Sequence, residues 1–432
     1  MTLRESARSI FDAALAAGDV RPLVTHALRE MPEPPGGRVL VVGAGKASGA
    51  MAAAAEDAWG DRIAAGVVAV KDGHTTPTRT VRLLEAGHPV PDERGAAAAR
   101  EIRALAESAG AGDLVLVLVS GGGSALTPAP VPPITLGDKQ RMTRLLLAAG
   151  ATINQLNVVR KHCSLLKGGQ LARAAAPARV EALLLSDVVG DPLDVIASGP
   201  TTPDVSTFAE ALGILDRFGL RDRAPRSIVE RLELGARGEL PETPKPGDPI
   251  FTRVRNTVIG NNALVVDAAA ARARALGFAP HVLTRSLEGE AREVARELIA
   301  RGQAIRAGRG PVAAPTCLIA GGETTVMVRG NGRGGRCQEA ALAAALSLQD
   351  QRDIVLLAAG TDGSDGPTDA AGAIVDGGSA ERARRHGADP VLGLEANDSN
   401  RVLGCSGDLL VTGPTNTNLL DLYLVLVDAS SS

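Results

Sequence analysis

The chain has 432 residues, more than one hydrophobic core ordinarily organises, so two domains are expected. Apolar residues make up 45% of the sequence and charged residues 22%, a balance typical of globular proteins that argues against a disordered chain. A net charge of −3 and an aromatic content of 2% argue against a nucleic-acid binder, which would carry a basic surplus and base-stacking side chains.

Cysteine usage and hydropathy indicate the cellular compartment of the protein. Its four cysteines lie far apart and form no Cys-x-x-Cys pair, which argues against structural zinc and fits a reducing compartment. The N-terminus lacks the apolar stretch of a secretory signal, and no apolar run reaches the roughly 18 residues of a membrane span. We therefore expect a cytoplasmic protein with no membrane partner.

Short apolar runs alternate with alanine-rich helical segments through the first half of the chain. The sequence from Thr2 to Glu5 has the pattern of a capping box that opens an amphipathic helix. Residues 114–119 are apolar at every position, as in a parallel strand covered on both faces. The same reasoning predicts further strands at 38–42, 66–70, 81–85 and 179–185, and helices at 50–57, 96–108, 135–150 and 157–176.

The second half follows the same alternation after residues 235–249, which are rich in Pro, Gly and charge and form the best linker candidate. Strands are expected there at 256–259, 281–283, 316–320, 325–328, 354–359 and 409–411, and helices at 263–276 and 338–348. This pattern predicts an α/β fold with mainly parallel sheets. We expect domains at 1–248 and 249–432, with the assignment of 256–300 open because a second loop follows at 303–315.

A glycine-rich loop follows the first predicted strand, where open α/β sheets bind ligands. It contains Gly43, Gly45, Lys46 and Ser48 just before a helix. Glycines let backbone N–H groups approach a phosphate, the helix start favours an anion, and a lysine adds a point charge. The spacing is not that of a Walker A motif, and it misses the dinucleotide fingerprint by one residue because the third glycine is Gly49. A tight turn with a solvated lysine is the alternative.

A second glycine-rich loop follows the fully apolar strand, with Ser120, Gly121, Gly122, Gly123 and Ser124 in sequence. Three consecutive glycines cost conformational entropy, and a tight turn usually needs only one. A backbone that wraps around a ligand is therefore the favoured interpretation.

Carboxylates and hydroxyls follow the strand at 179–185. Asp187 comes almost directly after it, and a carboxylate there can hold Mg²⁺ or accept a proton from a substrate hydroxyl. Asp191 precedes a proline and is typical of a turn. Ser198 and Thr201 follow in a Ser-Gly-Pro-Thr segment and complete this candidate binding set.

The predicted helix at 157–176 is basic at its start. Asn157, Arg160, Lys161 and Lys167 are candidates to line an anionic site. A solvated basic face is the structural alternative, and the sequence leaves both interpretations open. His162 is expected to be structural.

Two polar loops in the second half complete the candidate set. Glu323 follows one predicted strand, and Arg336 comes after two glycines at a helix start, where a guanidinium beside free N–H groups would make an anion clamp. Thr361, Asp362 and Asp365 follow another strand in a loop that lacks the terminal Glu of a calcium site. This loop is expected to face hydroxyls and a metal, with Asp362 and Asp187 as the metal-ligand candidates.

Phosphoryl transfer fits two halves that each offer a glycine-rich anion loop, one with Lys46 and one with Arg336 facing it across a cleft. A nicotinamide-dependent reductase stays open, because Asp72 ends the second strand where a ribose-binding acid would lie. A non-catalytic sugar- or anion-binding regulator is the third hypothesis. The sequence also leaves a monomer and a homodimer open.

These loops, in this order, resemble the glycerate 2-kinases that carry the MOFRL domain. The similarity extends from about residue 41 to 413 and includes the segment at 153–172. The other matching segments are VVGAGKASGAM, GHPVPDERG, SGGGSAL, LLLSDVVGDPLDVIASGPTTPD, GGETTVMVRGNGRGGRCQEAAL and AAGTDGSDGPTDAAGAIVDG.

The resemblance implies an ATP- and Mg²⁺-dependent kinase that converts D-glycerate, a small-molecule substrate, to 2-phosphoglycerate. It implies an N-terminal Rossmann-like doubly wound sheet and a C-terminal α/β domain, with the active site in the cleft. The family's catalytic lysine and arginine fall on Lys46 and Arg336, and Asp187 matches its Ser-Asp-Val pattern. Some relatives of this family are labelled as hydroxypyruvate reductases, so that activity is the alternative. Cys337 and Asn416 depart from the family pattern, and we expect these departures to alter local hydrogen bonding.

Overall fold

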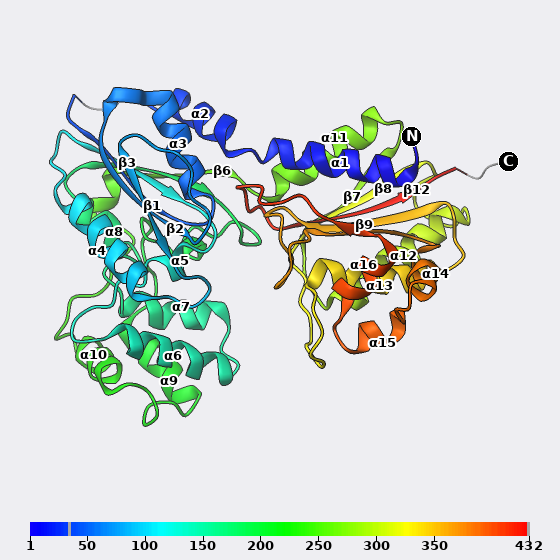
Figure 1. Cartoon of the computed structure of the whole chain (residues 1–432). Helices are drawn as coiled ribbons and strands as arrows, with labels where there is room; N and C mark the ends of the chain where they lie inside the picture. Colours follow the sequence, from blue (N-terminus) through cyan, green and yellow to red (C-terminus); the bar gives the residue numbers. More distant parts are fainter. Residues whose placement is uncertain (33–35, 430–432) are drawn as a thin grey trace. The chain divides into compact units, whose positions relative to one another are not determined.

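The computed structural model describes residues 1–32 and 36–429, which form two α/β units (Figure 1). One unit comprises Val20–Ile259, and the other combines Met1–Asp19 with Gly260–Ser432. The predicted α/β class with two domains is therefore confirmed. Among the described residues, no helix combines the length and apolarity that a membrane crossing requires.

The sheet of the Val20–Ile259 unit has the strand order of a doubly wound fold. It runs β3-β2-β1-β4-β5-β6, which is the order of a Rossmann-like sheet and confirms that expectation. The strands are β1 (Val39–Ala44), β2 (Ile63–Lys71), β3 (Val81–Ala86), β4 (Leu114–Val119), β5 (Arg179–Leu185) and β6 (Val254–Gly260). The central strands β1 and β4 pair in parallel and are buried at every position.

Helices of this unit fall into two groups. The first group surrounds the sheet and comprises α2 (Val20–Glu30), α3 (Ser48–Trp59), α4 (Glu93–Glu107), α5 (Gly123–Leu126) and α8 (Gln170–Ala175). The second group packs around its own apolar core and comprises α6 (Leu136–Ala148), α7 (Ile153–His162), α9 (Phe208–Arg217) and α10 (Arg226–Ala236). These four helices lie together in Figure 1. Short 3₁₀ turns lie at Gly60–Arg62, Ile196–Ser198 and Pro249–Arg253.

The helix predicted at 157–176 is two helices in the structure. Helix α7 ends at His162, and α8 begins only at Gln170. Gly168 and Gly169 lie between them with φ of 58° and 77°, a left-handed backbone that glycine adopts readily and that ends a right-handed helix. Arg160 and Lys161 therefore lie on α7, whereas Lys167 lies in the segment between the two helices.

The second unit contains a mixed sheet in the order β11-β10-β9-β12-β8-β7. Its strands are β7 (Ala279–Leu287), β8 (Thr316–Gly322), β9 (Ile354–Gly360), β10 (Gly372–Asp376), β11 (Leu409–Leu410) and β12 (Asp421–Val427). Among the described strands of this second sheet, only β7 and β8 pair in parallel. The expectation of mainly parallel strands holds for the first sheet and is wrong for this one, because no helix separates β9 from β10. Residues 325–328 also form no strand.

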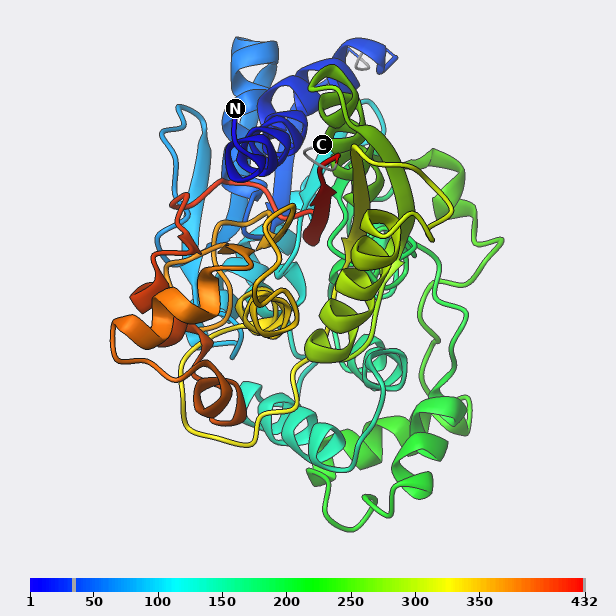
Figure 2. The same ribbon diagram turned by 90° about the vertical axis from the view of Figure 1, so that its right-hand side faces the viewer.

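Helices cover both faces of this second sheet. Helices α1 (Leu3–Ala17) and α11 (Asn262–Ala275) pack together on one face (Figure 1). On the other face α12 (Ala291–Arg306) and α13 (Arg336–Ser347) lie side by side (Figure 2). The shorter α14 (Ser379–Arg385), α15 (Pro390–Glu395) and α16 (Ser399–Ser406) pack beside α13.

The two units divide the chain differently from the expected boundary at 248/249. Helix α1 begins with the predicted capping box at Thr2, but it belongs to the second unit, where Ile10 and Phe11 are fully buried. Arg4 adds ion pairs to Asp376 and Asp408. The sequence left the domain of segment 256–300 undecided. In the structure, β6 is the last strand of the first sheet, whereas α11 and β7 belong to the second unit.

Candidate active site

Two loops meet at the point where the strand order of the first sheet reverses. Strand β1 lies between β2 and β4, and Ala44 pairs with Val119 at the carboxyl ends of β1 and β4. The backbone N–H of Lys46 donates to Gly121 O at 2.9 Å, and Ser48 Oγ lies 3.0 Å from Ser120 Oγ. The structure therefore brings the two predicted glycine-rich loops together in the crevice where doubly wound sheets bind ligands.

Glycines 43 and 45 are explained by the close packing of these two loops. A Cβ at Gly45, where φ is 151°, would lie 2.1 Å from Ser120 Oγ, and a Cβ at Gly43 would lie 2.1 Å from Leu118 O. The backbone N–H groups of 45–48 also have partners within the chain, among them Ala69 O for Gly45 and Ser120 Oγ for Ala47. The N–H groups of 45–48 thus donate within the chain, and the half-buried Lys46 side chain is what this part of the loop offers to an anion.

The second loop continues into a chain of polar side chains. Gly122 adopts a left-handed φ of 86°, and Gly123 begins helix α5 beneath Ala44. Ser124 Oγ lies 3.0 Å from Ser198 Oγ, which donates to Asn157 Oδ1 at 3.0 Å. Three predicted site residues from three separate segments thus form one hydrogen-bonded row. Thr201 is not part of it, because its hydroxyl donates to Asn256 on β6.

Asp187 lies at the same edge of the sheet. Strand β5 pairs with β4 so that Leu184 lies opposite Val119, which places Ser186 and Asp187 beside the start of the 120–124 loop. Ser186 closes the turn through hydrogen bonds with the backbone of Val188, and Asp187 is half-buried. A half-exposed carboxylate at this edge is accessible to a ligand bound at the strand ends.

The basic segment is neither a solvated face nor a uniform anion site. Lys161 is 4% exposed, and its Nζ lies 3.2 Å from Asp194 and 3.4 Å from Asp204, so its charge is compensated inside the protein. Lys167 is also buried, and it donates to Ser124 O at 2.8 Å, which holds the 120–124 loop from behind. The solvated-face alternative is therefore wrong for both lysines.

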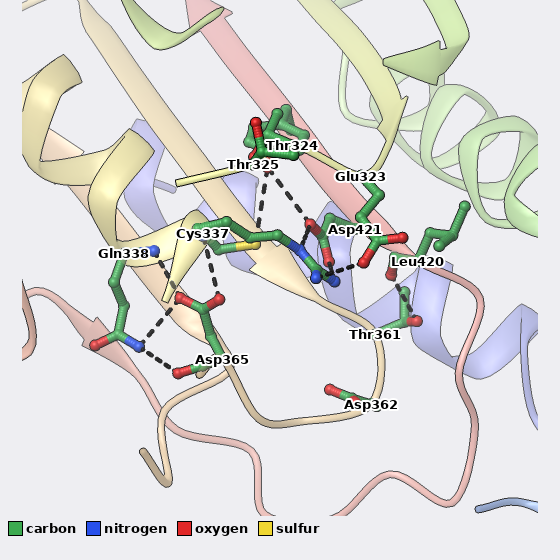
Figure 3. A network of polar contacts seen from close by, with 12 residues as sticks. Glu323, Thr324, Thr325, Cys337, Gln338, Thr361, Asp362, Asp365, Leu420 and Asp421 are labelled. Atoms are coloured by element: carbon green, nitrogen blue, oxygen red, sulfur yellow. Dashed lines mark hydrogen bonds and ion pairs between the residues drawn. The ribbon is translucent and has the colours of Figure 1, made fainter. Parts of the chain in front are cut away.

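Arg336 is the centre of the candidate site in the second unit, where it binds Glu323 and Asp421. Figure 3 shows the side chains of these two carboxylate partners pointing toward one another. The Nε and Nη2 atoms of Arg336 donate to the two carboxylate oxygens of Asp421 at 2.6 and 2.9 Å, and Nη1 donates to Glu323 at 2.6 Å. Burial disfavours the charged guanidinium, but the hydrogen bonds and charge of Asp421 raise the pKa of Arg336 overall. Arg336 is therefore a fixed cation.

Asp421 holds this position because of the sheet register. It begins β12, lies opposite Gly322 at the end of β8 and Gly360 at the end of β9, and its side chain is 1% exposed. The loops that carry Glu323 and Thr361 leave the sheet at those two points.

The start of α13 is already occupied by a carboxylate of the chain. Asp365 accepts hydrogen bonds from the backbone N–H of Cys337 at 3.2 Å and of Gln338 at 2.8 Å. The expectation of free N–H groups beside Arg336 is therefore wrong. Burial, assisted by the charge of Asp421, raises the pKa of Asp365 to about 6.

The remaining residues of the 361–365 loop shape the loop itself. Thr361 Oγ1 donates to Leu420 O and accepts from the N–H of Leu419, both at 2.8 Å, so it ties this loop to the segment before β12. Asp362 is half-buried and accepts from the N–H and the hydroxyl of Ser364. No group of three His, Cys, Asp or Glu side chains suited to a metal ion occurs among residues 1–32 and 36–429.

Several contributors were not predicted as site residues. Tyr423 is fully buried beside Arg336, and its hydroxyl lies 2.8 Å from Thr324 Oγ1 and 4.0 Å from Cys337 Sγ. Cys337, which departs from the family pattern, thus faces the hydroxyl of Tyr423. In the first unit, Lys139 also lies buried near Arg160 and Lys167. The apolar run at 422–427 was the available signal for Tyr423, whereas nothing local marks Lys139.

Comparison with known proteins gives two domain matches. A domain described as "Domain of unknown function (DUF4147)" matches residues 6–233, and the MOFRL family matches residues 316–421. Together these matches include both candidate loops of the first unit, and Arg336 with its partners Glu323 and Asp421.

Full-length relatives are also similar. A protein of Thermotoga maritima named "D-glycerate 2-kinase" is 45% identical over 90% of this chain and 91% of its own length. A protein of Agrobacterium vitis named "Putative hydroxypyruvate reductase" is 44% identical over 99% of this chain and 95% of its own. The crystal structure of a glycerate kinase from Thermotoga maritima superimposes with a TM-score of 0.90 at 42% identity, over 98% of this chain and 99% of that one.

Proposed function

This chain belongs to the glycerate 2-kinase family that carries the MOFRL domain, and we propose that it transfers a phosphoryl group from ATP to D-glycerate, giving 2-phosphoglycerate and ADP. The observation that carries the proposal is the match to a D-glycerate 2-kinase over nearly the full length of both chains. The resemblance drawn from the motifs is thereby confirmed. The four described cysteines are free thiols, which supports a reducing, cytoplasmic setting.

Lys46 and Arg336 neutralise the charge on the transferring phosphoryl group in this proposal. Phosphoryl transfer depends on positioning and charge stabilisation more than on covalent chemistry by the protein. A guanidinium has five N–H donors, and three of those of Arg336 go to Asp421 and Glu323, which leaves 5 − 3 = 2 for phosphoryl oxygens. The ion pairs thus orient Arg336 without using all of its donors.

Asp187 is the residue that fits a magnesium ion in the first unit. Mg²⁺ commonly binds through one or two carboxylates together with substrate phosphates and water, so a single half-exposed carboxylate beside the 120–124 loop is a suitable donor. When bound, the ion would neutralise phosphate charge. Asp187 itself orients the ion or the attacking hydroxyl, and Asp362 is the corresponding candidate in the second unit.

A hydroxypyruvate reductase is the second candidate, favoured by the name of the Agrobacterium vitis relative and by the Rossmann-like strand order. A dinucleotide site would use Asp72 for the ribose and the loop N–H groups for the pyrophosphate. Asp72 instead accepts hydrogen bonds from Arg94 at 2.6 and 2.8 Å. The N–H groups of 45–48 donate within the chain. These contacts favour the kinase.

One pair of assays separates the hypotheses. We expect ADP release from ATP and Mg²⁺ that depends on D-glycerate, and no oxidation of NADH or NADPH in the presence of hydroxypyruvate. Nucleotide oxidation without ADP release would establish the reductase. Binding of glycerate with turnover in neither assay would support the non-catalytic anion binder.

A further inference from the structure

Three cations gather inside the first unit without a carboxylate among them. Lys139 on α6 and Lys167 before α8 are both buried, and Arg160 on α7 is half-buried. The charges that act on Lys167 are those of Lys139 and Arg160, which lower its pKa after burial has already done so. The cluster consists of Lys139, Arg160 and Lys167. The charge of each member therefore raises the free energy that is needed to keep the other two charged.

The two lysines differ from the arginine in how they are satisfied. Lys139 Nζ donates to Pro128 O, and Lys167 Nζ donates to Ser124 O and Thr127 O. Arg160 forms no hydrogen bond or ion pair with any residue of the described ranges 1–32 and 36–429. Its five N–H donors are therefore available to a ligand.

Arg160 is placed to act together with the polar row of the candidate site. Asn157 lies three residues earlier on α7, so the two side chains project from the same face of the helix. Asn157 accepts from Ser198, whose hydroxyl meets that of Ser124 at the end of the second glycine-rich loop. An anion bound by Arg160 would thus lie beside the loops at the carboxyl edge of the sheet.

We propose that Arg160 binds the carboxylate of the acid substrate, while Lys139 and Lys167 supply positive charge without touching it. Removing a cation from water without an anionic partner costs free energy, and a bound anion offsets that cost. A single available guanidinium matches one carboxylate, which it can hold through two parallel hydrogen bonds. The proposal rests on the proposed function, and it assigns selection of an acid over a neutral polyol to this one residue.

Lys161 is excluded from this role although it neighbours Arg160 in the sequence. Its ion pairs with Asp194 and Asp204 already compensate its charge. The contacts thus distinguish two neighbouring basic residues that look alike in the sequence. Carboxylates compensate the charge of Lys161, and none among the described residues compensates that of Arg160.

The test compares Arg160→Gln with a matched control, Arg144→Gln, which removes an exposed arginine from α6 of the same unit. Loss of a charge-assisted contact of this kind costs enough to raise the KM for D-glycerate by about tenfold or more. The KM for ATP should stay near its wild-type value, and Arg160→Lys should restore part of the loss. Calorimetric titration with D-glycerate, without nucleotide, should show the same weakening. Any weak turnover of glycerol, which lacks the carboxylate, should not differ between Arg160→Gln and wild type.

Three outcomes would overturn the assignment. They are an unchanged KM for D-glycerate in a folded Arg160→Gln variant, a rise in the KM for ATP alone, and an equal loss in Arg144→Gln. The second outcome would place a nucleotide phosphate at Arg160. A wild-type protein that binds D-glycerate through Arg160 without phosphorylating it would refute the proposed function and retain this inference.

Discussion

Asp421 holds Arg336 with both of its carboxylate oxygens, at 2.6 and 2.9 Å, although the two residues lie 85 positions apart. The carboxylate is 1% exposed, and the guanidinium is about one third exposed. One side of Arg336 is thus fixed to the sheet, and the other faces outward through Glu323, whose side chain is 45% exposed. This arrangement fixes the direction in which Arg336 can meet a substrate.

The two carboxylates around Arg336 should differ in their effect on stability. Asp421→Asn removes one partner of a buried pair, and we expect the free energy of unfolding to fall by about 3 kcal/mol. Glu323→Gln removes an exposed partner and should cost less than about 1 kcal/mol. Urea unfolding of both variants measures the difference. Equal losses would mean that Asp421 is not the residue that anchors Arg336.

Removal of the charge of Lys46 should affect the rate of the chemical step. If Lys46 contacts the transferring phosphoryl group, Lys46→Ala should lower kcat by about 10²-fold or more. Lys71→Ala, which alters a lysine at the end of the neighbouring strand β2, is the control and should retain a kcat near wild type. A Lys46→Ala enzyme with normal turnover would remove Lys46 from the mechanism.

Asp365 should make stability depend on pH in acidic solution. Its pKa is raised from 3.8 to about 6 by burial, so between these values the folded protein keeps a proton that the unfolded chain has lost. The contribution of Asp365 is therefore fully present below about pH 4 and is lost as the pH rises through about 6. The stability of wild type relative to Asp365→Asn should fall between about pH 4 and about pH 6 in urea unfolding. A constant difference would contradict the raised pKa.

Two glycines of the first unit should respond to alanine in opposite ways. A Cβ at Gly45 would lie 2.5 Å from Ser120 O, so Gly45→Ala should destabilise the protein by about 2 kcal/mol. Gly213 lies inside α9 with nothing within 4 Å of the added methyl group, so Gly213→Ala should stabilise by about 0.5–1 kcal/mol. Thermal unfolding compares the two. A tolerated Gly45→Ala would show that the two loops are not tightly packed.

Local patterns predicted several of the strands that are buried along their whole length, but they missed β12. The apolar run at Leu114–Val119 is strand β4, and the capping box at Thr2 opens α1. The run at Asp421–Val427 carries the same signal as β4, so strand β12 was predictable by the same rule. Its antiparallel direction was not, because direction depends on which strands it meets in space.

Partners far apart in the sequence could not be predicted from local patterns. The carboxylate of Asp365 caps α13 from a loop 27 residues later, which no helix-start rule detects. Lys161 pairs with Asp204 at a separation of 43 residues, whereas its neighbour Arg160 pairs with no described residue. The sequence pattern treated these two basic residues alike, and only the folded chain distinguishes them. That Lys46 and Arg336 face each other across a cleft stays a prediction.

The most direct test of the central claim is phosphorus NMR of the products formed from ATP, Mg²⁺ and D-glycerate. We predict a new phosphomonoester on the 2-hydroxyl of glycerate, formed in step with ADP. A product phosphorylated on the 3-hydroxyl, or no phosphoester from a folded protein, would contradict the assignment as a glycerate 2-kinase.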